Sequence, residues 1–150
     1  MLFRSVLRKR ERYRQVFAGF DPRKVARLDP AKVARWMRDP GLIRHRGKLA
    51  SVIPNARVFL ALAAEHGSFA RWLWTFVDDR PVVRRGRPLG VSPEALAISK
   101  ELRRRGMKFV GPTIIHAFLQ AVGVYDEHAE GCFRAKRKKA RPRVRARVSR

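Results

Sequence analysis

The chain has 150 residues, of which 45% are hydrophobic, and it carries 36 Lys and Arg against 12 Asp and Glu. This length fits one domain, and the hydrophobic share supports a packed core and argues against a wholly disordered chain. The formal net charge of +24 favours a polyanionic partner, although arginine-rich composition is also typical of a GC-rich genome. A single cysteine, Cys132, excludes an internal disulfide, and no apolar run is long enough to span a membrane. We therefore expect a cytoplasmic protein.

Helical spacing of apolar residues dominates the chain, and no strand pattern competes with it. Asp-Pro pairs at 21–22 and 29–30 predict the starts of two short helices, because proline at the first helical position loses no bond that the helix needs. Pro54 is expected to kink a longer helix or to reset its start. Residues 78–92 are predicted to form a loop. The predicted helices cover about residues 3–17, 22–28, 30–37, 49–67, 68–76, 93–105 and 112–122. The sequence therefore predicts an all-α fold.

The last residues differ from the rest of the chain in charge. Residues 133–150 contain ten Lys and Arg and no acid, and such a like-charge block is expected to stay disordered until it meets an anion. We therefore predict a helical domain over 1–132 and a basic tail over 133–150 that binds phosphate without sequence preference.

A predicted helical hairpin over about 102–122 carries the clearest functional signal. One helix is expected to end at Gly106, and the next to begin at Pro112 or Thr113, with Phe109-Val110-Gly111 forming the tight turn. The N–H groups at the start of the second helix can bind a phosphate with the help of the helix dipole. This arrangement is suited to binding the DNA backbone rather than to reading the bases. A plain packing corner between two helices explains the same pattern equally well.

The hairpin resembles the helix-hairpin-helix of the DNA-3-methyladenine glycosylase I family. Further short segments resemble that family in the same order over residues 3–133. They include 6–11, Tyr13-Arg14, Phe17, Phe20-Asp21-Pro22, 24–26, 43–48, Asn55-Ala56-Arg57, Trp74, Phe76-Val77, Ser99-Lys100, 108–111 and Gly123.

The resemblance implies a helical bundle of the helix-hairpin-helix DNA glycosylase type. The implied reaction is hydrolysis of the N-glycosidic bond of 3-methyladenine in alkylated double-stranded DNA, with the damaged nucleotide turned out of the duplex. It also implies a bacterial, nucleoid-associated protein, which we expect to be a monomer that acts in base-excision repair.

Two groups of residues are implied to bind DNA. The first is in the hairpin and comprises Lys108, Val110, Gly111 and Thr113. The second lies in the segment IRHRGK and comprises Arg44, His45, Arg46 and Lys48. His45 fits a packed residue at a helix start as well as it fits a DNA contact.

The chain departs from the family at its start and near its end. The family normally has a further N-terminal stretch, which carries a Cys and a His of a structural zinc site and most of the base-pocket residues. Phe3 falls where the family has a pocket tryptophan, and Met1 falls near its DNA-intercalating leucine. His128 and Cys132 match the second half of the zinc site, with both ligands expected on one helical face. Two ligands do not complete a tetrahedral site, so zinc is expected to be loosely held or absent.

Asp126 stands where the family usually has asparagine. Other helix-hairpin-helix glycosylases use an aspartate near this point to stabilise positive charge on the sugar, which makes Asp126 a candidate catalytic residue. The simpler alternative is an acid in the first turn of a helix.

Other aromatic and histidine residues are expected to be structural. Phe69, Trp72, Trp74 and Phe76 are predicted to pack in the core rather than to stack on bases, and His116 is predicted to be half-buried there.

Three functions remain open from the sequence. The first is a glycosylase acting on alkylated DNA. The second is a truncated, catalytically impaired relative that grips the phosphate backbone through its hairpin and basic tail. The third is a ribosome- or RNA-associated basic protein, which charge alone favours and the resemblance disfavours.

Overall fold

The structure is a computed structural model that describes residues 3–135, and helices dominate it as predicted. The predicted tail over 133–150 therefore lies mostly outside the described residues. No helix in residues 3–135 is both long and apolar enough to cross a membrane. The helical elements are α1 (Phe3–Arg8), α2 (Arg10–Val16), the 3-10 helix η1 (Ala18–Phe20), α3 (Pro22–Ala26), α4 (Lys32–Trp36), α5 (Arg46–His66), α6 (Phe69–Trp74), the 3-10 helix η2 (Thr75–Val77), α7 (Pro93–Arg104) and α8 (Pro112–Ala121).

Side-chain caps start several helices where the sequence predicts them. Asp21 accepts hydrogen bonds from the backbone N–H groups of Arg23 and Lys24 at the start of α3. Ser68 and Ser92 cap α6 and α7 in the same way. Each cap satisfies an N–H group that has no partner inside its helix.

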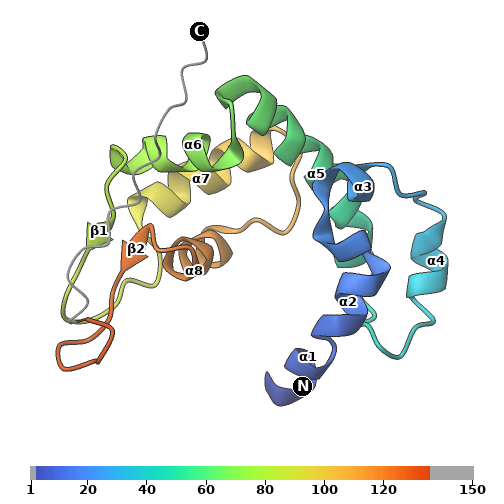
Figure 1. The fold of residues 1–150 in the computed structure, drawn as a ribbon, viewed down its shortest axis with the longest axis horizontal. Coiled ribbons are helices and arrows are strands. Elements are labelled where there is room, and N and C mark those ends of the chain that lie inside the picture. Colours follow the sequence, from blue (N-terminus) through green and yellow to red (C-terminus); the bar gives the residue numbers. More distant parts are fainter. Residues whose placement is uncertain (1–2, 136–150) are drawn as a thin grey trace, which may run out of the picture.

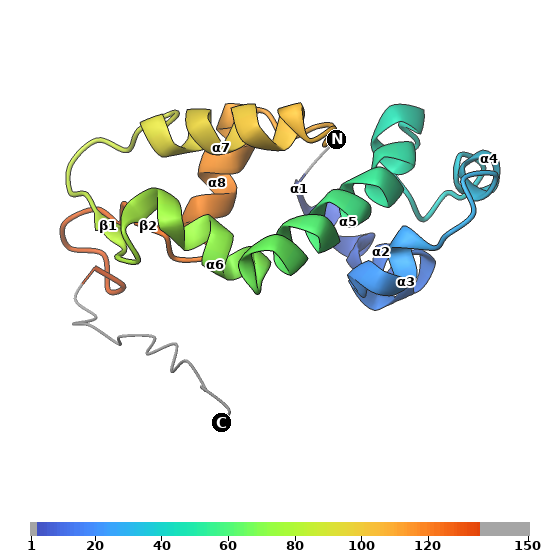
Figure 2. The same cartoon turned by 90° about the horizontal axis from the view of Figure 1, so that it is seen from above.

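The longest helix, α5, runs through both halves of the molecule (Figures 1 and 2). It begins at Arg46, three residues before the predicted start, because His45 caps it by accepting from the N–H of Lys48 at 3.2 Å. Pro54 lies inside the helix and does not end it. Gly67, with a φ of 79°, terminates it in the left-handed region that favours glycine.

Two hydrophobic cores lie along α5. The first packs α2, α3 and α4 against the N-terminal part of α5. Its buried residues are Phe17, Val25, Val33, Trp36, Leu42, Leu49 and Ile53. The second joins the C-terminal part of α5 to α6, α7 and α8, and includes Leu62, Trp72, Leu102 and Leu119. Trp72 is only 4% exposed, and Phe69, Trp74 and Phe76 pack on the same core. The predicted structural role of these four aromatic residues is confirmed.

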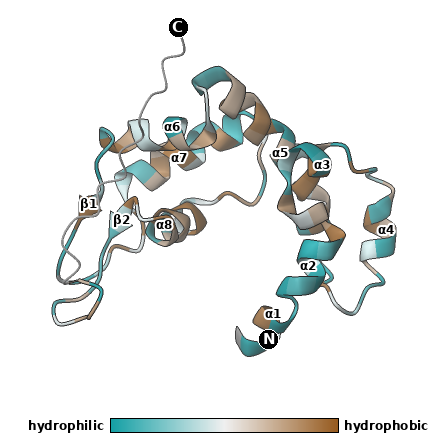
Figure 3. Cartoon of the chain, in the orientation of Figure 1, coloured by the Kyte–Doolittle hydropathy of each residue, from teal (hydrophilic) through white to brown (hydrophobic). Residues whose placement is uncertain are grey.

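The segment predicted as a hairpin, about 102–122, spans the end of α7, the turn after it and α8, and these two helices pack directly against each other. Hydrophobic residues dominate α8, whereas hydrophilic residues dominate α2 (Figure 3). The prediction of no strands is wrong at one place. Strands β1 (Val82–Val83) and β2 (Tyr125–Asp126) pair in parallel, with Val82 opposite Tyr125. Two residues are too few to produce an alternating pattern, so the sequence carries no signal for this sheet.

Ion pairs fasten the end of α5 to α7. Arg105 donates to Glu65 at 2.7 Å and to Glu101 at 2.6 Å. Arg104 donates to both carboxylate oxygens of Glu101, at 2.7 and 2.8 Å. Hydrogen bonds from Arg104 and then Arg105 lower the pKa of Glu101 from 4.5 to about 2. The carboxylate of Glu101 is therefore stabilised in its charged form in the fold.

This shift predicts a pH dependence of stability. The folded-state pKa of Glu101 lies below its unfolded-state pKa. The ionised carboxylate therefore stabilises the fold fully above about pH 4.5, and this stabilisation is lost as the pH falls towards 2. Glu101→Gln should lower the free energy of unfolding at neutral pH by about 1 kcal/mol. Urea unfolding at neutral pH and near pH 3 measures the difference between the two proteins, which should shrink at the lower pH.

Glu11→Gln is the matched control, because Glu11 is exposed on α2 and makes no ion pair within residues 3–135. Its effect should be small at both pH values. An equal loss for Glu101→Gln at both pH values would contradict the assignment.

Candidate nucleic-acid interface

The turn between α7 and α8 is held by side chains from two helices. The Ser99 hydroxyl on α7 donates to the carbonyl of Val110 at 2.7 Å. The Asn55 amide on α5 donates to the carbonyl of Lys108 at 2.9 Å and accepts from its N–H at 3.0 Å. Lys108 is therefore bound through its backbone, and its side chain is exposed to solvent.

The backbone of the turn is left-handed at two positions. Gly106 has a φ of 94° and Phe109 a φ of 60°, and the latter is uncommon for a bulky residue. Gly111 instead has an ordinary φ of −62° as the residue before α8. A Cβ placed on Gly111 would contact Arg103 at an ordinary 3.5 Å within the described part of the chain. The unusual backbone of the hairpin thus lies at Phe109 rather than at Gly111.

Phe109 joins the hairpin to the beginning of α5. Its ring lies edge-on to His45, with the centroids 5.5 Å apart. A Cβ on Gly47 would lie 3.1 Å from the end of the Phe109 ring, so the absence of a side chain there permits the contact. The two predicted DNA-binding segments, although far apart in the sequence, are therefore adjacent in space.

Most of the predicted DNA-binding side chains at this junction are exposed. Val110 and Gly111 are half-buried. The exposed residues are Arg44, His45, Arg46, Lys48, Lys108 and Thr113. His45 also caps α5, so the prediction of a packed helix-start residue and that of an exposed contact residue are compatible. Whether these residues bind DNA stays a prediction.

Two helix N-termini meet the hairpin at this surface. Residues at the start of a helix have backbone N–H groups without an intrahelical partner. At α5 the N–H of Lys48 is bound by His45, and those of Arg46 and Gly47 have no recorded acceptor among residues 3–135. At α8 Gly111 provides no side-chain cap. Backbone N–H groups, helix dipoles and exposed cations together form a surface suited to phosphate groups.

Sequence reasoning did not assign a role to Asn55 or Ser99. Both are polar residues on helices whose neighbouring positions are largely apolar, and Ser99 is 3% exposed. A polar residue on such a face needs a hydrogen-bond partner, which is the available sequence signal. The partners themselves are 53 residues away for Asn55 and 11 for Ser99.

Asp126 lies on β2 rather than in the first turn of a helix, so that alternative is wrong. Arg85 donates to its two carboxylate oxygens at 3.1 and 3.0 Å, and His128 Nδ1 lies 2.7 Å from Oδ1. Hydrogen bonds from Arg85 and then His128 hold the pKa of Asp126 well below its ordinary value. The carboxylate is therefore ionised and already paired. Its catalytic role stays a prediction.

The expected helical face for His128 and Cys132 is wrong. Both lie after β2 in a segment of turns that contains no helix. Within residues 3–135 no group of three or more His, Cys, Asp or Glu is arranged to hold a metal ion. A structural zinc site requires four ligands in tetrahedral geometry. The described residues do not fit a complete zinc site.

His116 is more deeply buried than predicted, with 3% of its surface exposed. Its Nε2 lies 3.1 Å from Glu127, whose carboxylate also accepts from Gln120 at 2.8 Å and from the N–H of Leu89 at 3.2 Å. Burial raises the pKa of Glu127, but these bonds together hold that pKa below its ordinary value. The network fastens residues after β2 to α8.

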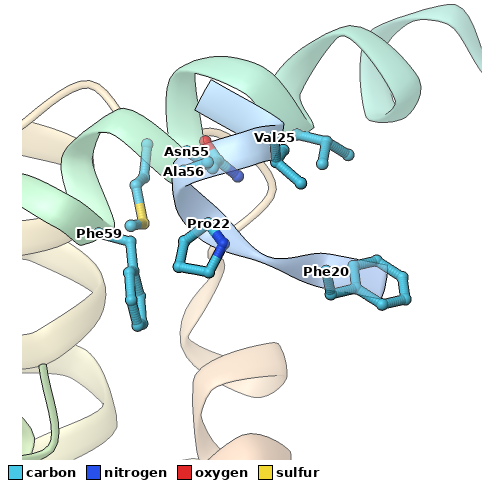
Figure 4. A pocket seen from close by; sticks show the side chains of 8 residues that line it. Phe20, Pro22, Val25, Asn55, Ala56 and Phe59 are labelled. Carbon is cyan, nitrogen blue, oxygen red and sulfur yellow. The ribbon is translucent and has the colours of Figure 1, made fainter. Parts of the chain in front are cut away.

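A cavity of about 330 Å³ lies between η1, α3, α5 and the hairpin turn (Figure 4). Its polar lining residue is Asn55, and both ends of that amide are bound to Lys108. The other lining residues are Phe20, Pro22, Val25, Val52, Ala56, Phe59 and Met107. The cavity therefore offers apolar contact rather than hydrogen bonds that could distinguish one base from another.

The segment at the edge of this cavity has a strained backbone. Ala18, Gly19 and Phe20 have φ values of 50°, 69° and 61°. A left-handed conformation costs roughly 1–2 kcal/mol for each residue other than glycine. It directs the Phe20 ring to the cavity rim, where the residue is 51% exposed. Phe17, directly before this turn, is fully buried and stabilises the base of the segment.

Comparisons with known proteins agree with this architecture. The family described as methyladenine glycosylase matches residues 1–135. DNA-3-methyladenine glycosylase 1 of Escherichia coli (strain K12) is 42% identical over 132 residues, which cover 85% of this chain and 71% of the relative. The DNA-3-methyladenine glycosylase of Haemophilus influenzae (strain ATCC 51907 / DSM 11121 / KW20 / Rd) is 38% identical over the same shares of the two chains.

Solved structures also superpose on the chain. A crystal structure of 3-methyladenine DNA glycosylase I matches with a TM-score of 0.80 and 41% identity, covering 89% of this chain and 75% of the other. A variant of 3-methyladenine DNA glycosylase I in complex with 3-methyladenine matches with a TM-score of 0.81 and 33% identity. That match covers 85% of this chain and 71% of the other.

The two hydrogen bonds between the Asn55 amide and the backbone of Lys108 yield a prediction about the hairpin. Asn55→Ala should lower the free energy of unfolding by about 1–3 kcal/mol, because it removes the partners of a backbone N–H and a carbonyl. Hydrogen exchange at the Lys108 amide should also become faster. Urea unfolding and exchange measured by NMR test the two effects.

Asn55→Asp is the matched variant, because a carboxylate still accepts from the Lys108 N–H but cannot donate to its carbonyl. It should protect the Lys108 amide better than alanine does. Unchanged exchange of this amide in Asn55→Ala would show that the bond does not hold the turn.

Proposed function

The chain belongs to the methyladenine glycosylase family, and we propose that it is a base-excision repair enzyme that hydrolyses the N-glycosidic bond of 3-methyladenine in alkylated DNA. The family match over residues 1–135 supports this function. The superposition on a glycosylase bound to 3-methyladenine supports the substrate class. The relatives named for this activity share 38–42% of their aligned residues with the chain.

The reaction breaks the bond between the base and C1′ of deoxyribose, and water supplies the hydroxyl group that remains on the sugar. Methylation gives the bound purine a positive charge, and the electron pair of the breaking bond neutralises it, so that 3-methyladenine leaves as a neutral molecule. Positive charge develops on the sugar instead, and it is discharged when water adds at C1′ and loses a proton. Such a leaving group needs less acid or base catalysis than an ordinary purine, so orientation and electrostatics can provide much of the acceleration. The described residues supply the part of this task that holds the DNA.

The observation that carries the proposal is the junction of the hairpin with the start of α5. Contacts from His45 to Phe109 and from Asn55 to Lys108 fix the two segments together. We assign the phosphate contacts to the exposed cations of both segments and to the backbone at the start of α8. These cations are Arg44, Arg46, Lys48 and Lys108. Contacts of this kind position the duplex without reading its sequence.

The proposed substrate is double-stranded DNA, and the proposed binding species is a monomer. A target base in a duplex must be turned out before its glycosidic bond can be reached, at a cost of a few kcal/mol. Contacts with the phosphate backbone on either side can offset that cost. The net charge of +24 also supports association with nucleoid DNA, because it attracts polyanions without sequence preference.

An excision assay tests the activity. Incubation of the full chain with methylated DNA should release free 3-methyladenine, detected by chromatography, and leave abasic sites. Unmethylated DNA of the same sequence is the control. Binding of the methylated DNA without any release of base would overturn the proposed activity and leave only a DNA-binding role.

Salt titration tests the proposed phosphate contacts. Affinity for duplex DNA should fall steeply with salt, and Lys108→Ala should reduce the slope of log affinity against log salt by about one. Arg80→Ala is the matched control, because Arg80 is exposed in the loop between η2 and β1 and belongs to neither predicted DNA-binding segment. Equal slopes for Lys108→Ala and the unmodified chain would show that Lys108 does not contact the phosphate backbone.

A further inference from the structure

We propose that an arginine-centred cluster, formed by Arg85, Asp126 and His128, fastens the C-terminal segment of this chain without a metal ion. The C-terminal segment is defined here as residues 127–135, which follow β2. This attachment closes the fold after β2, and it does not depend on the proposed glycosylase activity.

The C-terminal segment has little regular structure to hold it. The parallel β1–β2 pair ends with the N–H of Arg84 donating to the carbonyl of Asp126 at 2.9 Å. Beyond that point, the recorded backbone bonds within the described chain are local turns, at Cys132 and Ala135. Side chains must therefore provide the attachment of the C-terminal segment.

Arg85 provides one such attachment indirectly, by binding Asp126, the residue directly before the C-terminal segment. Its Nη1 donates to Oδ1 of Asp126 at 3.1 Å, and its Nη2 donates to Oδ2 at 3.0 Å. Nη1 also lies 3.2 Å from the backbone carbonyls of Arg84 and Asp126. The side chains of Arg85 and Asp126 are 28% and 31% exposed. A bidentate pair of this kind fixes orientation as well as distance.

His128 completes the cluster from the C-terminal segment itself. Its backbone N–H and its Nδ1 both approach Oδ1 of Asp126, at 3.2 and 2.7 Å. An ionised carboxylate only accepts hydrogen bonds, so Nδ1 is the donor. Both carboxylate oxygens are then in use, one bound by Arg85 alone and the other by Arg85 and His128. Asp126 thus links the loop after β1 to the C-terminal segment.

A second attachment lies directly beside the first. Arg84 Nε is 3.5 Å from Glu127, and both carboxylate oxygens of Glu127 have further partners. Glu127 is bound to His116 and Gln120 of α8 and to the backbone of Leu89. Two consecutive arginines therefore face two consecutive acids across the β1–β2 pair. This arrangement holds the start of the C-terminal segment on two sides.

Both carboxylate oxygens of Asp126 have hydrogen-bond partners without a metal ion. The Nδ1 bond to Asp126 leaves Nε2 of His128 outside the cluster, as in a metal-bound histidine whose other ring nitrogen is hydrogen-bonded to a carboxylate. Yet His128 and Cys132 provide two ligands, and the described part of the chain offers no group of three. The cationic partner of the Asp126 carboxylate is Arg85. An experiment must therefore separate an arginine-centred attachment from one that depends on zinc.

Metal content and chelation separate the two. The full chain, purified without chelator and passed through gel filtration, should contain far less than one zinc per chain by elemental analysis. Its Tm should not change with EDTA or with added zinc. One retained zinc per chain, or a fall in Tm with EDTA that His128→Ala abolishes, would overturn the proposal.

Substitution of the arginine gives an independent readout. Arg85→Gln should lower the Tm and speed hydrogen exchange at the His128 amide by about two- to fivefold, as expected for loss of a partly exposed ion pair. Arg85→Lys keeps the charge but loses the bidentate geometry, so its effect should be intermediate. If Arg85→Gln does not fold, a smaller exchange effect in Arg85→Lys supports the same conclusion.

Arg87→Gln is the matched control, because Arg87 is exposed in the same loop and makes no ion pair within residues 3–135. It should leave the Tm and the His128 amide unchanged. The double variant Arg85→Gln with Asp126→Asn should lose less stability than the two single changes added together. Additive effects, or an unchanged His128 amide in both Arg85 variants, would show that the cluster does not fasten the segment.

Discussion

The amide of Asn55 makes the contact on which the candidate interface depends. It binds both backbone polar groups of Lys108, a residue 53 positions away, and so fixes the hairpin turn to the middle of α5. An exposed turn held only by its own helices would leave its cations free to move relative to those at the start of α5. With the turn fixed, His45, Phe109 and Lys108 form one surface. The groups that we propose to bind phosphate are therefore brought together by contacts within the chain itself.

Most acidic side chains make ion pairs or hydrogen bonds within the fold, whereas many cationic side chains are exposed to solvent. Asp39, Glu65, Glu101, Asp126 and Glu127 all pair with arginine. Asp21 caps α3, and Glu94 accepts from the Tyr125 hydroxyl. The remaining acids, such as Glu11, are exposed, but 36 Lys and Arg against 12 acids keep the net field strongly positive. A strong positive field of this kind suits a protein that must search along DNA.

Local chemistry made much of the fold predictable. Asp21, Ser68 and Ser92 start helices where a capping residue precedes an apolar pattern, and the bounds of the hairpin follow from Gly106 and Pro112. The β1–β2 pair could not be predicted, because two residues carry no period. The cluster around Asp126 was also missed, since Arg85 and Asp126 are 41 residues apart. Placing His128 and Cys132 on a helix failed because their spacing of four also fits an irregular turn.

The position of α5 also affects how the whole molecule unfolds. Leu49 and Ile53 near its start belong to the first core, and Leu62 near its end belongs to the second. A helix that loses its packing at one end loses part of the support for the other, because short isolated helices are marginal in water. The two cores are therefore thermodynamically coupled through one continuous element. Denaturation should proceed as a single cooperative event, in which neither half survives as a stable intermediate.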